Sequence, residues 1–493
     1  MPAESPPAFH RNIRDPLAER LIGPGKDWEL ETVMVRGRPQ QVFRHMPRNL
    51  AEIYRRGMAF GDKDMIVFGK ERFSYSQGFA RAAALARALH DDFGVRQGTK
   101  VAVVMSNRPE WILSLIAITS LGGIAALINS RGVAEEMLRA MARADCQLAI
   151  LDAERDDIIM AHSGSEPASP LPLAGGVGGG PAGRGTRAAP DLTHPPLTPP
   201  ASGRGTRLRR IVLGAPAHPL RPGDADFAVL SAAIPGLAFE PRDIHPDEGA
   251  VVLFTSGTTG FPKGALLSHG ALAASVSVAT FMGALYDTRY EEESGEKLPD
   301  HQRAMATPAV ILGPMFHLGG IMPSLRAISL GTTIHIMGKW NSEIAFDMIE
   351  TVGMTRLNFV PAMLFDMFKS PRATPELLAQ VRYMANGAAP LDMALVEQIR
   401  AKMPNCQLSN GYGQTEATAW TCGISGDIYL QHPAACGWAA PTAQVQLRRD
   451  DGSEPAIGEP GELYVSSPMV MNEYINDPEA TAEALHDGWL ASG

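Results

Sequence analysis

Short apolar runs alternate with amphipathic, helix-length stretches along most of this 493-residue chain. The apolar runs predict buried strands, and the stretches between them predict helices. The predicted strands are KVAVVMSN (100–107), QLAILDA (147–153), RIVLGA (210–215), AVVLFTS (250–256) and TTIHIMG (332–338). The predicted helices cover residues 81–93, 134–144, 342–352 and 393–403. This alternation predicts an α/β fold in which helices cover mostly parallel sheets.

The most apolar stretch, residues 111–129, has the length of a membrane span. Gly122 and Gly123 divide it into a helix-length piece and a strand-length piece, and Asn107 and Pro109 supply a helix start in front of it. We therefore expect a buried helix followed by a buried strand, and no transmembrane segment. The N-terminus has no apolar core of the kind that a secretory signal needs.

Two polar regions interrupt the pattern. Residues 163–209 are rich in Pro, Gly, Ala and Arg, and such a segment buries too little apolar surface to offset the entropy of ordering. We expect a disordered insertion there, and an exposed loop at residues 289–303. The expected division is a first α/β portion (1–162), the insertion (163–209), a nucleotide- and acyl-binding α/β core (210–430) and a β-rich end (431–493).

Charge and cysteine content narrow the function classes. With 44 basic and 53 acidic residues the net charge is −9, which disfavours nucleic-acid binding because that requires a basic face. The four cysteines form no CxxC pair, which argues against a disulfide framework or a zinc site. A reducing cytoplasm is the expected location. Composition leaves peripheral membrane contact and dimer formation open.

The candidate chemistry begins where the strand AVVLF runs into TSGTTGFPKG (255–264). A loop of glycines and hydroxyls after a strand can surround phosphate oxygens with N–H and O–H donors, and a lysine adds positive charge. The loop differs from GxxxxGK[ST] of P-loop NTPases, because Lys263 stands three residues after Gly260 and is followed by Gly264. It therefore predicts another class of phosphate-binding protein.

TSGTTGFPKG, followed by SHG (268–270), resembles the phosphate-binding loop of the AMP-forming adenylating enzymes, which include acyl-CoA synthetases, luciferases and peptide-synthetase adenylation domains. Of these, the chain most resembles a fatty-acyl-CoA synthetase. The resemblance implies the large N-terminal domain of that family: two mixed or parallel sheets sandwiched by helices, plus a small β subdomain. It also implies ATP, Mg²⁺ and coenzyme A as ligands. The residues that it assigns to the β- and γ-phosphates are Thr255, Ser256, Thr258, Thr259 and Lys263, and the cofactor-binding loop also includes Gly257 and Gly260, which allow close approach.

Further stretches match the family in order. PMFHLGG (314–320) would place His317 near the substrate carboxylate, although a histidine beside a phenylalanine is more often a core residue. NGAAPL (386–391) would line one face of adenine with Gly387, Ala388 and Ala389, although by itself it reads as a helix-entry turn.

SNGYGQTEA (409–417) is the second strong match, and without the resemblance it would be a Gly-rich turn. Tyr412 would stack on adenine, and Asn410 would reach its amino edge. Gly413 belongs to the same nucleotide-binding turn. Thr415 would contact the α-phosphate, and Glu416 would hold Mg²⁺. An aromatic ring suits a base and a carboxylate suits a hard cation.

The resemblance implies ATP-dependent activation of a carboxylic acid to an acyl adenylate and then an acyl-CoA thioester, with Lys263, Thr415, Glu416 and His317 in catalytic roles. A fatty acid is the expected substrate class, and an aryl acid is the alternative. The match ends at DGWLASG (487–493), so the family's C-terminal domain is expected to be missing and activity reduced. A nucleotide- or acyl-binding protein without turnover, and a kinase or NTPase, are the rival functions.

Overall fold

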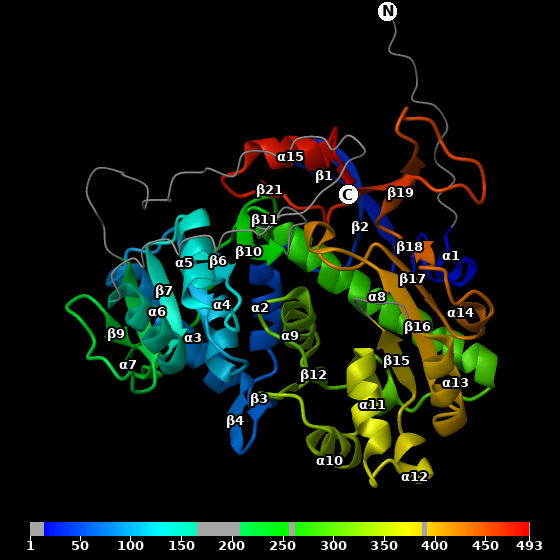
Figure 1. Cartoon of the computed structure of the whole chain (residues 1–493), viewed down its shortest axis with the longest axis horizontal. Helices are drawn as coiled ribbons and strands as arrows, with labels where there is room; N and C mark the ends of the chain where they lie inside the picture. Colours follow the sequence, from blue (N-terminus) through cyan, green and yellow to red (C-terminus); the bar gives the residue numbers. More distant parts are fainter. Residues whose placement is uncertain (1–13, 165–207, 256–261, 387–391, 493) are drawn as a thin grey trace, which may run out of the picture.

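The computed structural model describes residues 14–164, 208–255, 262–386 and 392–492. The predicted insertion at 163–209 lies almost entirely outside the described residues. Figure 1 shows the arrangement of the whole chain, with the N-terminal strands and helices in blue and cyan and the C-terminal segments in orange and red.

The largest sheet has eight strands and contains four of the five predicted strands. Its central strands run parallel, whereas β11 is antiparallel to both of its neighbours. Their apolar side chains are buried on both faces, as expected of a parallel sheet covered by helices. In sheet order the strands are β21 (Glu473–Tyr474), β11 (Lys263–Ser268), β10 (Gly249–Thr255), β6 (Ile124–Leu127), β5 (Lys100–Val104), β7 (Leu148–Asp152), β8 (Arg209–Leu213) and β9 (Ala225–Asp226).

The other sheets complete the expected two-sheet architecture with a small β subdomain. The second large sheet consists of β14 (Arg356–Phe359), β15 (Tyr383–Asn386), β16 (Gln407–Tyr412), β17 (Cys422–Ser425) and β18 (Trp438–Ala439). A four-stranded sheet holds β12 (Ala309–Ile311), β13 (Ile334–Ile336), β3 (Asp64–Phe68) and β4 (Glu71–Ser74). The small subdomain holds β19 (Gln444–Arg448), β20 (Glu462–Ser466), β23 (Trp489–Ala491) and β22 (Leu485–His486), and β1 (Leu30–Val35) pairs with β2 (Arg38–Phe43).

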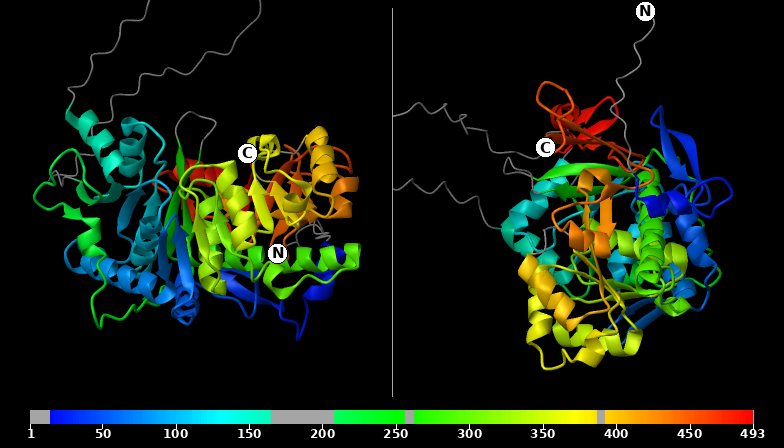
Figure 2. Two further views of the ribbon diagram at one scale, coloured as in Figure 1. Left: turned by 90° about the horizontal axis from the view of Figure 1, so that it is seen from below. Right: turned by 90° about the vertical axis from the view of Figure 1, so that its right-hand side faces the viewer.

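Helices cover these sheets, and all four predicted helices are present. The small β subdomain and α15 (Pro478–Ala484) lie together on one side of the molecule (Figures 1 and 2). The remaining helices are α1 (Pro16–Leu21), α2 (Leu50–Met58), α3 (Tyr75–Asp91), α4 (Pro109–Ser120), α5 (Ala134–Arg143), α6 (Ala153–Gly164), α7 (Phe227–Leu230), α8 (His269–Ser294), α9 (Leu318–Leu330), α10 (Ser342–Val352), α11 (Pro361–Lys369), α12 (Pro375–Leu378), α13 (Met393–Lys402) and α14 (Asp427–Gln431), with short 3-10 turns η1 (Asp300–Gln302) and η2 (Thr415–Ala417).

The apolar stretch at 111–129 forms the buried helix α4 and the buried strand β6, as predicted. The predicted helix start is only partly right. Pro109 occupies the first turn, but the N-cap residue is Arg108 and no side chain caps the helix. The Asn107 amide is used elsewhere: it donates to the Gly313 carbonyl at 2.8 Å and accepts from the Met315 amide at 3.0 Å. Asn107 therefore fixes the loop in front of α9.

The predicted exposed loop at 289–303 is wrong over its first part, because α8 continues to Ser294 and ends at Gly295 with φ of 72°. Arg289 is stabilised there by a largely buried ion pair with Asp15, which its polar sequence neighbours did not indicate. Within the described residues, α8 is the one helix long and apolar enough to span a membrane. It runs from β11 to the second sheet (Figure 1), and 72% of its apolar window is buried inside the protein, as in a core helix.

His269, the first residue of α8, is buried, and we expect this to make the protein less stable in acid. It is 1% exposed, neither ring nitrogen has a hydrogen-bond partner within the described residues, and burial lowers its pKa to about 4. As pH falls from about 6.5, the unfolded chain binds this proton before the folded chain does. Stability from this group is therefore present above about pH 6.5 and is lost as pH falls towards 4, by on the order of 3 kcal/mol.

Urea unfolding of wild type and His269→Leu at pH 7.5 and pH 4.5 measures this difference. We expect the variant to lose less unfolding free energy than wild type between the two pH values. Equal losses in the two proteins would show that His269 does not titrate in this way.

Candidate functional site

The first predicted motif begins at the open end of a hairpin. Strand β10 is buried through Leu253 and pairs with β11 so that Thr255 lies opposite Lys263. The Thr255 hydroxyl is 3.4 Å from the Lys263 carbonyl. Ser256, Gly257, Thr258, Thr259 and Gly260 lie outside the described residues, as do Gly387, Ala388 and Ala389. The two ends of the predicted phosphate loop are therefore fixed by one strand pair.

The second motif begins within β16, which runs parallel to β15 and antiparallel to β17. The Asn410 side-chain amide donates to the Ala435 carbonyl at 3.0 Å, which leaves its oxygen available as an acceptor. Tyr412 is half-buried and its hydroxyl is hydrogen-bonded to Ser492. Burial raises the pKa of Tyr412, so the ring stays neutral at physiological pH. Both residues thus have the chemistry that an adenine ring requires.

After β16 the chain folds back tightly on itself. A Cβ atom at Gly413 would lie 1.4 Å from the Ala419 carbonyl oxygen, so only glycine fits that position. Thr418 and Ala419 have φ of 47° and 87°, a conformation that is unfavourable for side-chain-bearing residues. Besides its backbone hydrogen bonds, two side-chain hydrogen bonds hold the turn, one from the Thr418 hydroxyl to the Met469 carbonyl and one from the Ser275 hydroxyl to the Thr418 carbonyl. The turn therefore presents Thr415 and Glu416 in a fixed position.

Tyr474 brings the two motifs together. Its hydroxyl donates to Oε1 of Glu416 at 2.7 Å, and the Lys263 ammonium lies 5.1 Å from the centre of its ring. The Met471 amide also donates to the Glu416 carbonyl at 2.7 Å. A carboxylate and an ammonium from distant parts of the sequence thus meet at one side chain.

His317 lies at the surface immediately before α9, with its ring 4.5 Å from that of Phe316. Desolvation of the ring and then the positive charge of Arg131 lower the pKa of His317. Within the described residues no hydrogen bond or ion pair joins His317 to Lys263, Thr415 or Glu416. The charged group that acts on His317 is instead Arg131, which follows β6. Because β6 and β10 are parallel neighbours, Arg131 and Thr255 lie at the same edge of the sheet.

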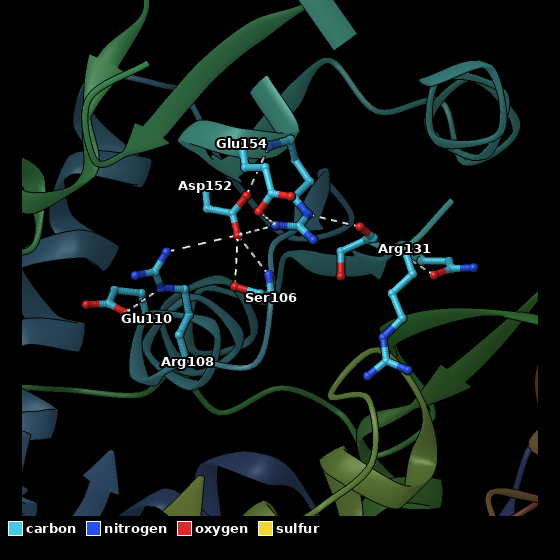
Figure 3. Close-up of polar contacts among 9 residues, drawn as sticks. Ser106, Arg108, Glu110, Arg131, Asp152 and Glu154 are labelled. Carbon is cyan, nitrogen blue, oxygen red and sulfur yellow. Dashed lines mark hydrogen bonds and ion pairs between the residues drawn. The ribbon is translucent and has the colours of Figure 1, made fainter. Parts of the chain in front are cut away.

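A buried carboxylate organises this edge (Figure 3). Oδ2 of Asp152, at the end of β7, accepts from the Ser106 amide at 2.9 Å and from the Ser106 hydroxyl at 3.0 Å. Arg155 binds the same carboxylate at 3.5 Å and donates to the Ser130 carbonyl at 2.9 Å. Figure 3 shows the Arg131 side chain extending away from this cluster. Asp152 therefore fixes the ends of three parallel strands and leaves Arg131 outside its network.

A family model described as AMP-binding enzyme matches residues 53–475. This chain belongs to that family.

Curated relatives within the AMP-binding family are CoA ligases. The chain is 32% identical over 257 residues to 4-coumarate–CoA ligase 3 of Oryza sativa subsp. japonica, covering 51% of this chain and 44% of the relative. It is 28% identical over 435 residues to indoleacetate–CoA ligase of Aromatoleum aromaticum, covering 87% of this chain and 72% of the relative. The chain thus spans less than half the length of the rice relative in that match.

A solved structure confirms the expected fold. The inhibitor-bound N-terminal domain of FACL13 from Mycobacterium tuberculosis superposes with a TM-score of 0.68 at 23% identity, covering 91% of this chain and 96% of that domain. The α/β architecture predicted from the sequence is therefore the architecture of the AMP-binding family.

Glu416 is the residue of the second motif whose chemistry could suit a metal ion. Within the described ranges, no three His, Cys, Asp or Glu side chains cluster so that they could hold a metal ion by themselves. Glu416 offers one carboxylate, of which Oε1 already accepts from Tyr474. Mg²⁺ is commonly bound by one or two carboxylates together with substrate phosphates. Glu416 in this AMP-binding fold therefore suits Mg²⁺ bound to ATP.

Two residues of this region were not predicted from the sequence. Tyr474 lies outside both motifs, and only its pairing with β11 places it between Lys263 and Glu416. Arg131 stands in a loop after the buried strand β6. Parallel sheets bind ligands beyond the carboxyl ends of their strands, so a cation at that position could have been predicted from the sequence as a site residue.

Proposed function

We propose that this chain carries the active site of an ATP-dependent, AMP-forming acid–CoA ligase. In the first step a substrate carboxylate oxygen bonds to the α-phosphorus of ATP, and the bond from that phosphorus to the bridging oxygen breaks as pyrophosphate leaves. In the second step the sulfur of coenzyme A bonds to the acyl carbon, AMP leaves, and the thiol proton passes to solvent. The convergence of Lys263 and Glu416 on Tyr474 is the observation that supports this proposal.

The proposed roles follow the chemistry of each group. Tyr412 stacks on adenine, and the Asn410 amide oxygen accepts from its amino group. Lys263 binds the β- and γ-phosphates together with Thr255 and the rest of the loop. Thr415 donates to the α-phosphate, where negative charge develops in the transition state. Mg²⁺ bound to Glu416 would neutralise further phosphate charge. His317 lies on the substrate side in this proposal.

We propose a hydrophobic carboxylic acid as substrate. The segment around His317 is apolar, with Met315, Phe316 and Ile321 buried. A fatty acid is our first candidate. An aryl acid is the second, because the curated relatives include 4-coumarate– and indoleacetate–CoA ligases.

A cytoplasmic location also stays a prediction.

Product analysis tests the proposed reaction. The chain is incubated with Mg-ATP, coenzyme A and separate short, medium and long fatty acids and aromatic acids, and nucleotides and thioesters are identified by mass spectrometry. We expect AMP, pyrophosphate and an acyl-CoA with one acid class. Release of ADP or inorganic phosphate would favour a kinase or NTPase, and nucleotide binding without any product would favour a binding protein.

A further inference from the structure

The segment 471–475 is bonded through its backbone to both motifs of the candidate site. Strand β21 pairs with β11 so that Tyr474 lies opposite Ala265. The Asn472 and Ile475 amides donate to the Leu266 and Gly264 carbonyls, each at 2.8 Å, and the Met471 amide donates to the Glu416 carbonyl at 2.7 Å. The segment therefore sets the position of Tyr474 relative to the lysine strand and to the carboxylate turn at once.

The Tyr474 side chain is held as firmly as its backbone. It is 8% exposed, and its hydroxyl donates to the Glu416 carboxylate at 2.7 Å, a charge-assisted hydrogen bond. Only Oε1 of Glu416 is used in this bond.

The ring of Tyr474 faces the other charge. Lys263 lies 5.1 Å from the ring centre, within the range of a cation–π interaction. A phenol that donates a hydrogen bond to a carboxylate has a higher electron density in its ring. This strengthens the attraction between the ring and the ammonium. Within the described residues no ion pair joins Lys263 to Glu416, although both lie against one side chain. A direct ion pair would neutralise the two groups that must bind phosphate and Mg²⁺.

We propose that Tyr474 is a positioning residue that keeps Lys263 and Glu416 separate, oriented and available for ATP phosphates and Mg²⁺. This inference rests on the proposed function, because it takes its roles for Lys263 and Glu416 from there. Tyr474 contacts neither nucleotide nor substrate in this proposal. It acts through the ammonium and through the carboxylate, with one interaction for each.

Two variants separate the two interactions. Tyr474→Phe keeps the ring beneath Lys263 and removes the hydroxyl from Glu416, whereas Tyr474→Leu removes both. Tyr464→Phe is the matched control, because it removes the hydroxyl from another tyrosine whose ring lies against a cation: Arg448 is 4.1 Å from the centre of the Tyr464 ring, in the small β subdomain. Calorimetric titration with ATP at several Mg²⁺ concentrations, and with AMP, measures binding without relying on turnover.

For Tyr474→Phe we expect the Mg²⁺ concentration that half-saturates the increase in ATP affinity to rise about tenfold, with AMP affinity unchanged. Tyr474→Leu should also weaken ATP binding measured without Mg²⁺, because Lys263 loses its partner. Tyr464→Phe should match wild type. A Tyr474→Phe protein with wild-type Mg²⁺ dependence, or one that loses AMP and ATP affinity equally, would overturn the proposal.

The same titrations distinguish this inference from the proposed function. If wild type binds ATP in a Mg²⁺-dependent way but forms no acyl-CoA, the proposed function fails, and the Tyr474 variants still decide the positioning role. If wild type shows no Mg²⁺-dependent ATP binding, both proposals are overturned.

Discussion

Lys263→Ala is expected to lower acid-dependent ATP–pyrophosphate exchange by about 10²–10³-fold while leaving AMP affinity close to wild type. Lys263 stands at the first position of β11, opposite Thr255. Its ammonium rests over the Tyr474 ring at 5.1 Å, and within the described ranges it forms no ion pair with a carboxylate. It is therefore free to bind the β- and γ-phosphates, which AMP does not have.

Exchange rates and AMP titrations measured on one preparation test this expectation. Lys402→Ala is a matched control, because the Lys402 ammonium also lies over an aromatic ring, 5.4 Å from the centre of Phe368, on α13 away from the site. The control should exchange at the wild-type rate. Loss of AMP affinity in Lys263→Ala as large as the loss of exchange would contradict a phosphate-specific role.

Tyr412→Ala should weaken the binding of ATP and AMP alike, whereas Lys263→Ala should leave AMP binding close to wild type. Stacking of a base on an aromatic side chain contributes about 1–3 kcal/mol, which corresponds to a rise of about 10- to 100-fold in Kd for both nucleotides. Tyr412 is placed for this role at the end of β16, next to a turn that only Gly413 permits.

Tyr412→Phe keeps the stacking face and removes the hydroxyl that bonds Ser492, so it should bind both nucleotides nearly as well as wild type. Fluorescence or calorimetric titration gives the two dissociation constants. If Tyr412→Ala and Lys263→Ala weakened AMP binding equally, the separate assignment of adenine and phosphate contacts would be wrong.

The regular elements were predictable because their signals are local. The division of residues 111–129 at Gly122 and Gly123 is seen as α4 followed by β6, and the four predicted strands found in the large sheet end within three residues of their predicted ends. The loop predicted at 289–303 was wrong over residues 289–294, where the last turns of α8 are paired across the fold, Arg289 with Asp15 and Glu292 with Arg20. The polar residues next to Arg289 in the sequence do not indicate that Asp15 pairs with it.

For the candidate site, the structure brings Lys263 and Glu416 from two motifs against Tyr474, and their contacts with a nucleotide stay predictions. Lys263, Tyr412 and Glu416 stand in compact motifs whose residue types indicate their chemistry. Tyr474 was not predicted, because its role depends on a two-residue strand at the edge of the sheet and on a hydrogen bond to a distant turn. The loop residues from Ser256 to Gly260 and the stretch from Gly387 to Ala389 lie outside the described residues, so their assigned contacts stay predictions.

The most direct test of the central claim is carboxylate-dependent ATP–pyrophosphate exchange on this chain. The assay follows labelled pyrophosphate into ATP with Mg²⁺ present, coenzyme A omitted and one acid added at a time, from short fatty acids to aromatic acids. We expect exchange with one class of hydrophobic acid, well above the rate without acid and strongly reduced in Lys263→Ala. A folded chain that binds ATP but exchanges no faster with any acid than without acid would contradict this expectation.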